Sequence, residues 1–181
     1  MDHRADTYID GKWVENNGED VIAVIDPSTG QCVATVRESA TEDMDRAVEA
    51  ALRARPVMRA MPPEERAALL ERVADRLEAR VDELAELVSS EMGMPRKHCG
   101  NYQVRTAIGT FRNTARAVAD VDFSAPLDGS APSGGSTVLR EPVGVVAAIV
   151  PWNFPFEVTI QKLGQAMATG NTIVLKPAPN T

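Results

Sequence analysis

The chain has 181 residues, enough for one domain of ordinary size with a buried core. Its composition is globular, with 44% hydrophobic and 25% charged residues, and its net charge is −7. This acidic balance argues against nucleic acid as a partner, because phosphates require a basic surface. It does not exclude a small anionic cofactor, which needs only a local positive patch.

The N-terminal stretch MDHRADTYIDGKW is polar and lacks the apolar core of a signal peptide. No apolar run approaches the length of a membrane span, so we expect no membrane partner. The two cysteines, Cys32 and Cys99, permit one disulfide but do not indicate a disulfide framework. We therefore expect a cytoplasmic protein.

Short antiparallel strands are predicted at the start of the chain. Residues 8–14 are typical of a hairpin with an Asp-Gly tight turn. Two further strands are predicted over 21–25 and 32–36, joined by the turn sequence Asp-Pro-Ser-Thr-Gly at 26–30.

Three helices are predicted next. Thr41 is expected to cap the first, which should end near Arg55, before a proline. The second begins at Pro62 and is predicted to run as one helix to Gly93, because its apolar residues recur at steps of three and four. A third helix covers 97–119. The apolar stripe of the second helix consists of Leu70, Val73, Leu77, Val81, Leu84 and Val88.

The pattern changes in the last third of the chain. Residues 124–135, SAPLDGSAPSGG, predict a loop or linker, followed by a strand over 136–141. Residues 145–150 are continuously apolar, which is typical of a parallel strand covered on both faces. A helix over 156–169 and a strand over 172–175 complete a strand–helix–strand crossover. Ligands bind beyond the carboxyl ends of such strands.

The sequence Pro-Trp-Asn-Phe-Pro at 151–155 lies just past the end of the first of these strands. Two prolines fix the backbone, so the amide of Asn153 between them is held in place. A fixed amide can donate to a developing oxyanion, an interaction worth about 10²–10³ in rate. An asparagine before a proline and a helix is also an ordinary helix cap, and spacing alone favours the cap.

The segment from Arg140 to Ala178 closely resembles the NAD(P)-dependent aldehyde dehydrogenase superfamily. The N-terminal hairpin, the Asp-Pro-Ser-Thr-Gly turn and the acidic helix starts are similar too, so the resemblance covers essentially the whole chain. It implies an α/β fold in which small antiparallel strands and helices lead into a Rossmann-like parallel βαβ unit. Its specific motifs are Glu-Pro-Val-Gly at 141–144, Pro-Trp-Asn-Phe-Pro at 151–155, Lys162, Gly-Asn at 170–171 and Lys-Pro-Ala at 176–178.

The resemblance divides the chain into three parts. Residues 1–123 would be the N-terminal hairpins and helices of the cofactor-binding domain, 124–141 a loop and strand for oligomerisation, and 142–181 the start of the Rossmann-like βαβ unit. The catalytic domain would be absent from this chain, because the family's nucleophilic cysteine and general-base glutamate lie farther along the sequence. The full-length protein would be a homo-oligomer, a dimer or a tetramer.

Members of this family act on small aldehydes: a cysteine thiolate attacks, hydride passes to the nicotinamide, and water hydrolyses the thioester. The resemblance implies that Asn153 stabilises the oxyanion of the first adduct. It implies a charge-relay role for Lys162, whose alternative is an ordinary helix-surface lysine. Lys176 would bind ribose hydroxyls, and its alternative is a solvated lysine at a strand end.

Two sets of lining residues follow from the resemblance. One set lines the aldehyde tunnel, and for its aromatic and aliphatic members, Phe154 and Val158, core packing is the alternative role. The aldehyde tunnel would be lined by Phe154, Val158 and Gln161, and the cofactor cleft by Val150, Pro151, Trp152, Asn153, Lys176, Pro177, Ala178 and Pro179.

Some residues depart from the family pattern. Pro179 stands where many NAD-preferring members carry a glutamate, so both NAD and NADP are candidate cofactors. Glu157 and Gln161 place a polar pair near the tunnel, so the aldehyde is not identified. No G-x-G-x-x-G motif is present. A metal site is not predicted, because no ligand spacing relates His3, Cys32, His98 and Cys99.

Two classes of function remain. The chain is the N-terminal part of an enzyme that oxidises an aldehyde to a carboxylic acid with NAD(P)⁺. Alternatively, it is a catalytically inactive truncated product that serves as a partial nucleotide-binding or subunit-association module. We predict that the 181 residues alone are inactive with any aldehyde. Because two parallel strands leave edges and faces uncovered, the isolated chain should be sticky, oligomeric or partly molten.

Overall fold

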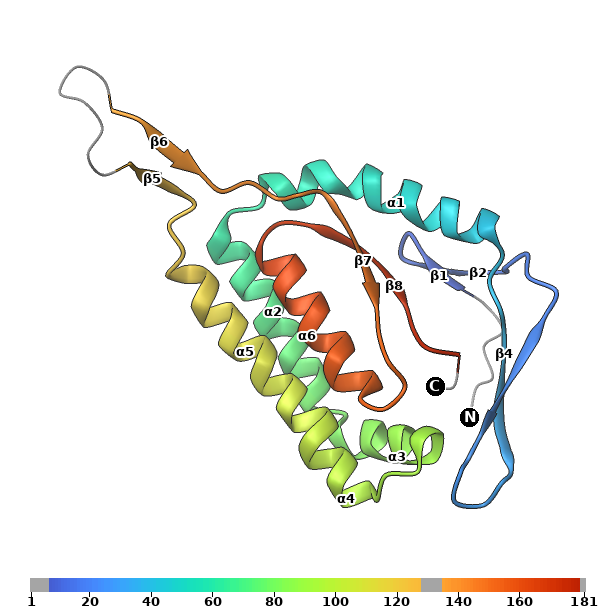
Figure 1. The fold of residues 1–181 in the computed structure, drawn as a ribbon. Helices are drawn as coiled ribbons and strands as arrows, with labels where there is room; N and C mark the ends of the chain where they lie inside the picture. Colours follow the sequence, from blue (N-terminus) through green and yellow to red (C-terminus); the bar gives the residue numbers. More distant parts are fainter. Residues whose placement is uncertain (1–6, 128–134, 180–181) are drawn as a thin grey trace.

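The structure, a computed structural model, describes residues 7–127 and 135–179. A group of long helices lies beside a two-stranded parallel sheet, and three antiparallel hairpins lie around this centre (Figure 1). The sequence expectation of an α/β fold is confirmed. Among the described residues, no helix is both long and apolar enough to cross a bilayer.

The N-terminal strands form two antiparallel hairpins, as predicted. The first turns at Asp10 and Gly11, both of which have positive φ. The turn of the second is closed by Asp26, whose Oδ1 accepts the Ser28 N–H at 2.8 Å. The strands are β1 (Thr7–Ile9), β2 (Lys12–Val14), β3 (Val21–Ile25) and β4 (Cys32–Arg37).

Helix α1 (Thr41–Ala60) differs from the prediction at both ends. Its N-cap is Ala40 rather than Thr41, and Asp43 Oδ2 accepts the Ala40 N–H at 3.0 Å. The helix also continues through Pro56, which was expected to end it. The carbonyl four residues before this proline belongs to Leu52, which is 50% exposed, so water can replace the missing hydrogen bond.

The stripe predicted as one helix forms two, α2 (Pro63–Glu78) and α3 (Val81–Met92). Arg80 breaks the helix with φ −120° and ψ 18°, and its Nε donates to Glu83 at 2.8 Å. Because the chain bends at Arg80, the two halves of the apolar stripe pack against different elements. Helix α2 packs on the later helices α5 (Thr106–Ala119) and α6 (Pro155–Ala168), and α3 packs on the π-helical segment that follows it.

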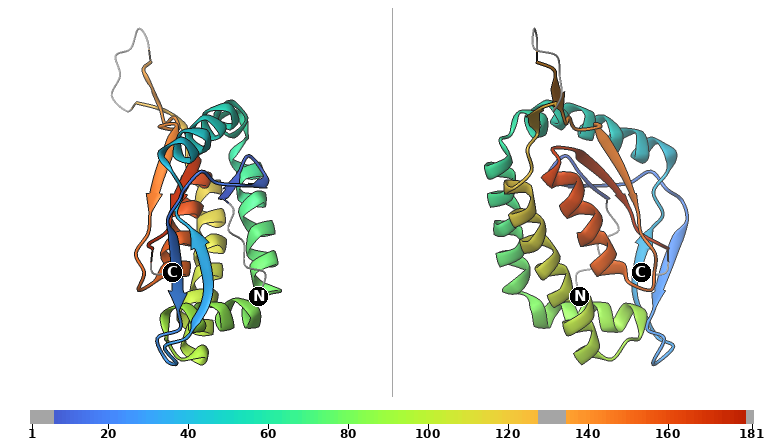
Figure 2. Two further views of the ribbon diagram at one scale, coloured as in Figure 1. Left: turned by 90° about the vertical axis from the view of Figure 1, so that its right-hand side faces the viewer. Right: turned by 60° about the vertical axis from the view of Figure 1, so that its left-hand side comes forward.

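The helix predicted over 97–119 is continuous but not uniform. A short α4 (Arg96–His98) leads into a π-helix, η1 (Cys99–Arg105), and then into α5 (Thr106–Ala119). Helices α2, α5 and α6 lie side by side, as both views of Figure 2 show, and enclose the main core. The fully buried side chains of this core include Leu70, Ala74, Val104, Ala107 and Phe111.

The predicted linker contains a strand that its composition did not indicate. β5 (Ser124–Pro126) pairs antiparallel with β6 (Thr137–Leu139), which lies within the strand predicted at 136–141. The pair projects away from the helices (Figure 1). Residues 128–134 of the predicted loop lie outside the described part of the chain.

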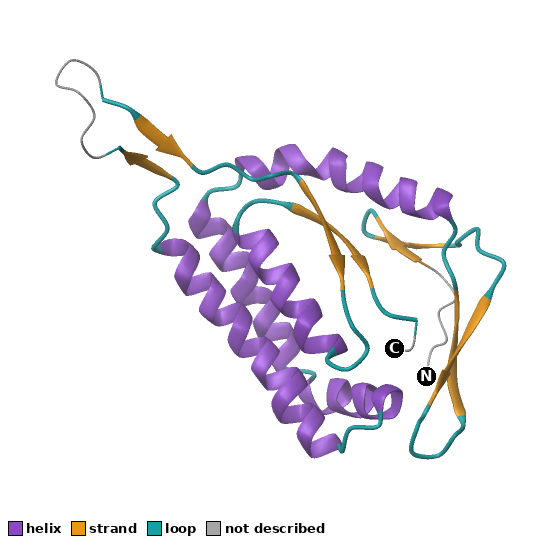
Figure 3. Cartoon of the chain, in the orientation of Figure 1, coloured by secondary structure: helices purple, strands orange, loops and turns teal. Residues whose placement is uncertain are grey.

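The predicted crossover is confirmed. β7 (Val145–Ile149) pairs in parallel with β8 (Thr172–Lys176), and α6 (Pro155–Ala168) connects them. Helix α1 packs near the amino-terminal ends of the strands, where Thr172 Oγ1 donates to Ala51 O at 2.9 Å. The carboxyl ends point the other way, toward the turn into α6 (Figure 3).

Candidate active site

The carboxyl ends of β7 and β8 lie side by side. The Val150 N–H donates to Lys176 O at 3.2 Å, so the pairing extends one residue past β7. The chain then leaves each strand through a proline, which fixes its direction. The two segments that the sequence analysis assigned to the cofactor, 150–153 and 176–179, are therefore neighbours in space.

Asn153 is exposed on the loop between β7 and α6. It does not cap the helix, because the N-cap of α6 is Phe154 and no side chain caps it. The Asn153 side-chain amide has no hydrogen bond to any residue in the described ranges 7–127 and 135–179. The capping interpretation that spacing favoured is wrong, and the amide is free to meet a ligand.

A buried side chain contacts this loop from the protein interior. Gln103 of η1 is 0% exposed, and its Nε2 lies 3.5 Å from the backbone oxygen of Asn153. Its Oε1 accepts the Glu157 N–H at 3.3 Å. The sequence analysis did not identify Gln103, although a polar residue among the apolar positions of the predicted third helix was a signal.

A hollow of about 410 Å³ adjoins the strand ends. Trp152 and Pro179, two of the predicted cofactor residues, line it together with β3 and the end of α3. Burial raises the pKa of the Glu91 carboxyl in its wall. The lining residues from β3, from the turn after it and from α3 were not connected to this site by their sequence, and they are Ile22, Ala23, Ile25, Pro27, Glu91 and Met92.

The other predicted site residues lie on two elements. Lys176 is exposed and donates from Nζ to the neighbouring Pro177 carbonyl at 3.1 Å. On α6, Lys162 and Gln161 are exposed, whereas Val158 is half-buried. The structure thus brings the predicted cofactor residues together at one edge, while the roles of the α6 residues stay predictions.

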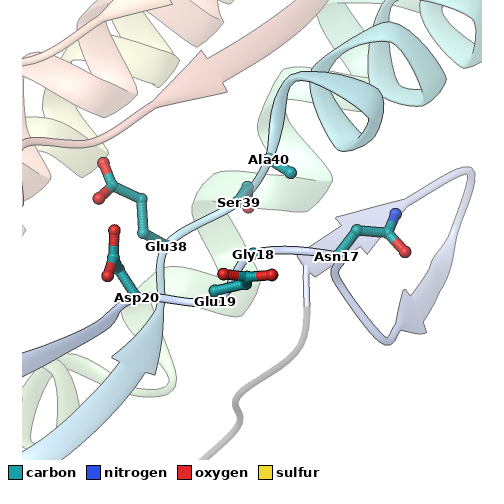
Figure 4. A pocket seen from close by; sticks show the side chains of 7 residues that line it. All are labelled: Asn17, Gly18, Glu19, Asp20, Glu38, Ser39 and Ala40. Atoms are coloured by element: carbon teal, nitrogen blue, oxygen red, sulfur yellow. The ribbon is translucent and has the colours of Figure 1, made fainter.

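A second hollow, of about 360 Å³, contains none of the predicted site residues. It lies between the segments 17–20 and 38–40 (Figure 4). Three carboxylates, on Glu19, Asp20 and Glu38, surround it and disfavour an anionic cofactor. Within the described part of the chain, no group of His, Cys, Asp or Glu side chains is arranged to hold a metal ion.

Neither cysteine lines the hollow at the strand ends. Cys99 is buried in η1, where its thiol donates to Met94 O at 3.3 Å. Burial raises the pKa of this thiol, which disfavours the reactive thiolate. Cys32 lies exposed on β4. The described residues therefore place a candidate oxyanion donor and candidate cofactor residues at the strand ends, and neither cysteine is among them.

A sequence model of the family described as "Aldehyde dehydrogenase family" matches residues 13–181. The chain belongs to the aldehyde dehydrogenase family. It is 36% identical over 180 residues to glutarate-semialdehyde dehydrogenase from Pseudomonas putida, covering 98% of this chain and 37% of that protein. It is 39% identical over 180 residues to phenylacetaldehyde dehydrogenase from Pseudomonas fluorescens, covering 96% and 36%.

Solved structures of aldehyde dehydrogenases share this fold. A crystal structure of Mycobacterium tuberculosis aldehyde dehydrogenase complexed with NAD⁺ superposes with a TM-score of 0.92 at 37% identity, covering 99% of this chain and 37% of that chain. The predicted family and fold are therefore confirmed. The chain spans little more than a third of the length of these relatives.

Proposed function

We propose that this chain supplies the N-terminal, cofactor-binding part of an aldehyde dehydrogenase, which oxidises an aldehyde to a carboxylic acid with NAD⁺ or NADP⁺. The observation that carries the proposal is the amide of Asn153, exposed beside two parallel strand ends and not used to cap a helix. Family membership and relatives named as dehydrogenases of different aldehydes support it.

Asn153 acts on the oxygen of the aldehyde. When a thiolate adds to the carbonyl carbon, the oxygen gains negative charge, and a preorganised neutral amide can donate to it without titrating. The prolines on either side of the loop limit how far the amide can move. The thiolate and the general base belong to the part of the family fold that these residues do not include.

The strand ends fit a nicotinamide cofactor. Lys176 offers an exposed ammonium group whose present acceptor is its neighbour's carbonyl, so ribose hydroxyls can replace that contact. The hollow beside Trp152 and Pro179 adjoins the same edge. The bound cofactor supplies a hydride acceptor, whereas the residues of this chain bind and orient it.

The choice between NAD⁺ and NADP⁺ depends on Pro179. Proline offers no carboxylate to grip the 2′-hydroxyl, and it also exerts no charge repulsion on a 2′-phosphate. We therefore propose that both cofactors are used. Replacing NAD⁺ by NADP⁺ in the assay below measures the use of each cofactor directly.

We also propose that different segments of the chain have different roles. Residues 1–123 and 142–181 build the cofactor-binding part, and the projecting β5–β6 hairpin within 124–141 joins subunits. The charge-relay role of Lys162 and the tunnel positions of Phe154, Val158 and Gln161 belong to the same proposal.

The test is an assay of cofactor reduction by an enzyme that contains this segment together with the remainder of the family fold. A panel of aliphatic, aromatic and semialdehyde substrates is run with each cofactor. We expect reduction with at least one aldehyde. If no combination of aldehyde and cofactor gives reduction, the result contradicts the proposal and favours the alternative of a non-catalytic binding or association module. Reading the coding sequence past Thr181 for a cysteine in a glycine-rich context separates the same alternatives.

A further inference from the structure

We propose that Gln103 is a positioning residue that locks the loop carrying Asn153. It acts through the backbone of this loop and does not touch the substrate. The proposal rests on the proposed function of Asn153, but its first test does not depend on catalysis.

Gln103 reaches both sides of the loop. Its amide nitrogen faces the carbonyl of Asn153, 50 residues away in sequence, and its amide oxygen accepts the N–H of Glu157 in the first turn of α6. The remaining contact of this amide in the described structure is Met92 Sδ, 3.7 Å from Nε2. Because a fully buried amide is costly unless paired, the two backbone groups fix where Gln103 and the loop sit relative to each other.

The π-helix explains how Gln103 is aimed at the loop. Gln103 lies within η1 (Cys99–Arg105), a rarely used conformation that recurs at functional sites. A π turn holds an additional residue relative to an α turn, so converting η1 to α-helix would rotate one flank against the other by about 100°. That rotation would carry Gln103 away from the loop, or the core face of α5 away from α2.

The prolines alone do not fix Asn153. Pro151 and Pro155 restrict their own φ angles, and Pro155 also restricts Phe154 before it, whereas Trp152 and Asn153 keep free dihedrals. Gln103 pins the middle of that stretch at the carbonyl of Asn153. A displacement of about 1 Å in a catalytic group can lower the rate a hundredfold. Holding the backbone at Asn153 should therefore affect the rate of the reaction.

Hydrogen exchange on an enzyme that contains this segment tests the lock directly, without a measurement of catalysis. Gln103→Met keeps the size of the side chain and removes both polar contacts, and Gln103→Glu keeps an acceptor for the Glu157 N–H. The matched control is Asn101→Ala, an exposed amide in the same π-helix. We expect faster exchange of the Glu157 N–H in Gln103→Met, and unchanged exchange there in Gln103→Glu and Asn101→Ala, with β7 and β8 unchanged in all three. Unchanged exchange at Glu157 in Gln103→Met overturns the proposal.

Kinetics of an enzyme that contains this segment provide the second readout. Gln103→Met should lower kcat by about tenfold or more and change the Kd of the cofactor far less, because the amide of Asn153 needs the more exact placement. In an Asn153→Ala background, the same substitution should have little further effect on kcat. An undiminished loss of kcat in that background overturns the positioning role. If Asn153→Ala alone leaves kcat intact, the proposed function fails while the exchange result still decides the lock.

Discussion

Lys176 carries the clearest cofactor contact at the scale of single residues. Its ammonium group is exposed at the end of β8 and bonds a backbone carbonyl that water can satisfy instead. Lys176→Ala should therefore weaken cofactor binding by about tenfold, the value of a charge-assisted hydrogen bond, and leave kcat at saturating cofactor nearly unchanged. Isothermal titration with NAD⁺ measures the affinity. An equal loss in the exposed Lys97→Ala control would show that the effect is not specific to the site.

Asp43 anchors the first helix to the segment before β3. Its buried carboxylate accepts the Asn17 N–H and Asn17 Nδ2, both at 2.8 Å, and pairs with Arg46 at 3.0 Å. Burial alone raises the pKa of Asp43, but these bonds and the Ala40 N–H lower it below its ordinary 3.8. Asp43→Ala should cost about 2–3 kcal/mol of unfolding free energy at pH 7.

The pH dependence of that loss has a defined sign. Because the folded pKa lies below the unfolded one, the contribution of Asp43 is complete above about pH 4 and is lost as pH falls through the folded value. Urea unfolding of wild type and Asp43→Ala should therefore converge in acid. The exposed Asp45→Ala is the control, and a pH-independent gap between wild type and Asp43→Ala would contradict the role of the charge.

Sequence reasoning found the exposed half of the site and missed the buried half. Asn153, Trp152 and Lys176 follow strands that are recognisable from a few consecutive residues, so local pattern and family resemblance were enough. Gln103 contacts the loop across 50 residues of sequence, and Glu91 lines the same hollow as Trp152 although α3 is far from it in sequence. Local pattern encodes neither arrangement, because both depend on tertiary packing.

At the scale of elements, Gly170 forms the turn from α6 into β8. Its φ is +79°, and an added Cβ would lie 2.4 Å from Nη1 of the buried Arg66 and 2.9 Å from Pro142 Cγ. Arg66 cannot easily yield, because it stacks 4.8 Å over the ring of Phe123. Gly170→Ala should cost about 2–4 kcal/mol through backbone strain and overpacking.

Gly109→Ala is the matched control for this substitution. An added Cβ at Gly109 in α5 meets nothing within 4 Å, so helix propensity should make the change neutral or stabilising by up to about 1 kcal/mol. Both variants are compared by urea unfolding. Equal stability of the two would contradict the crowding described at Gly170.

Helices and strands were predictable where a short stretch of sequence determines their type and bounds. Hairpin turn chemistry and the continuous apolar strand predicted β1 to β4 and the β7–α6–β8 crossover. The bend at Arg80 was missed because the apolar stripe continues across it with unbroken spacing. Helix α1 continued past Pro56 because tertiary contacts, such as the Thr172 bond to Ala51, outweigh a proline on an exposed face. β5 was missed because its Ser-Ala-Pro sequence has low strand propensity and pairs only with distant residues.

At the scale of the whole molecule, the described part of the chain leaves apolar surface exposed. β7 and β8 form a sheet of only two strands, and Ile149 is 71% exposed at its open end. Trp152 just past this end and Val143 before the start of β7 are also exposed. We expect the isolated chain to self-associate, and size-exclusion chromatography with light scattering measures this. A monomer with a sharp, reversible melt would show that this surface needs no cover.

The account as a whole depends on one amide held beside the two strand ends. The decisive measurement is kcat for Asn153→Ala in an enzyme that contains this segment, with the Kd of the cofactor determined alongside. We predict a fall in kcat of about 10²–10³ with a far smaller change in cofactor affinity. Asn153→Asp should lose at least as much, because an ionised carboxylate accepts hydrogen bonds but cannot donate one to an oxyanion. A variant that keeps its turnover and loses only thermal stability would contradict the account.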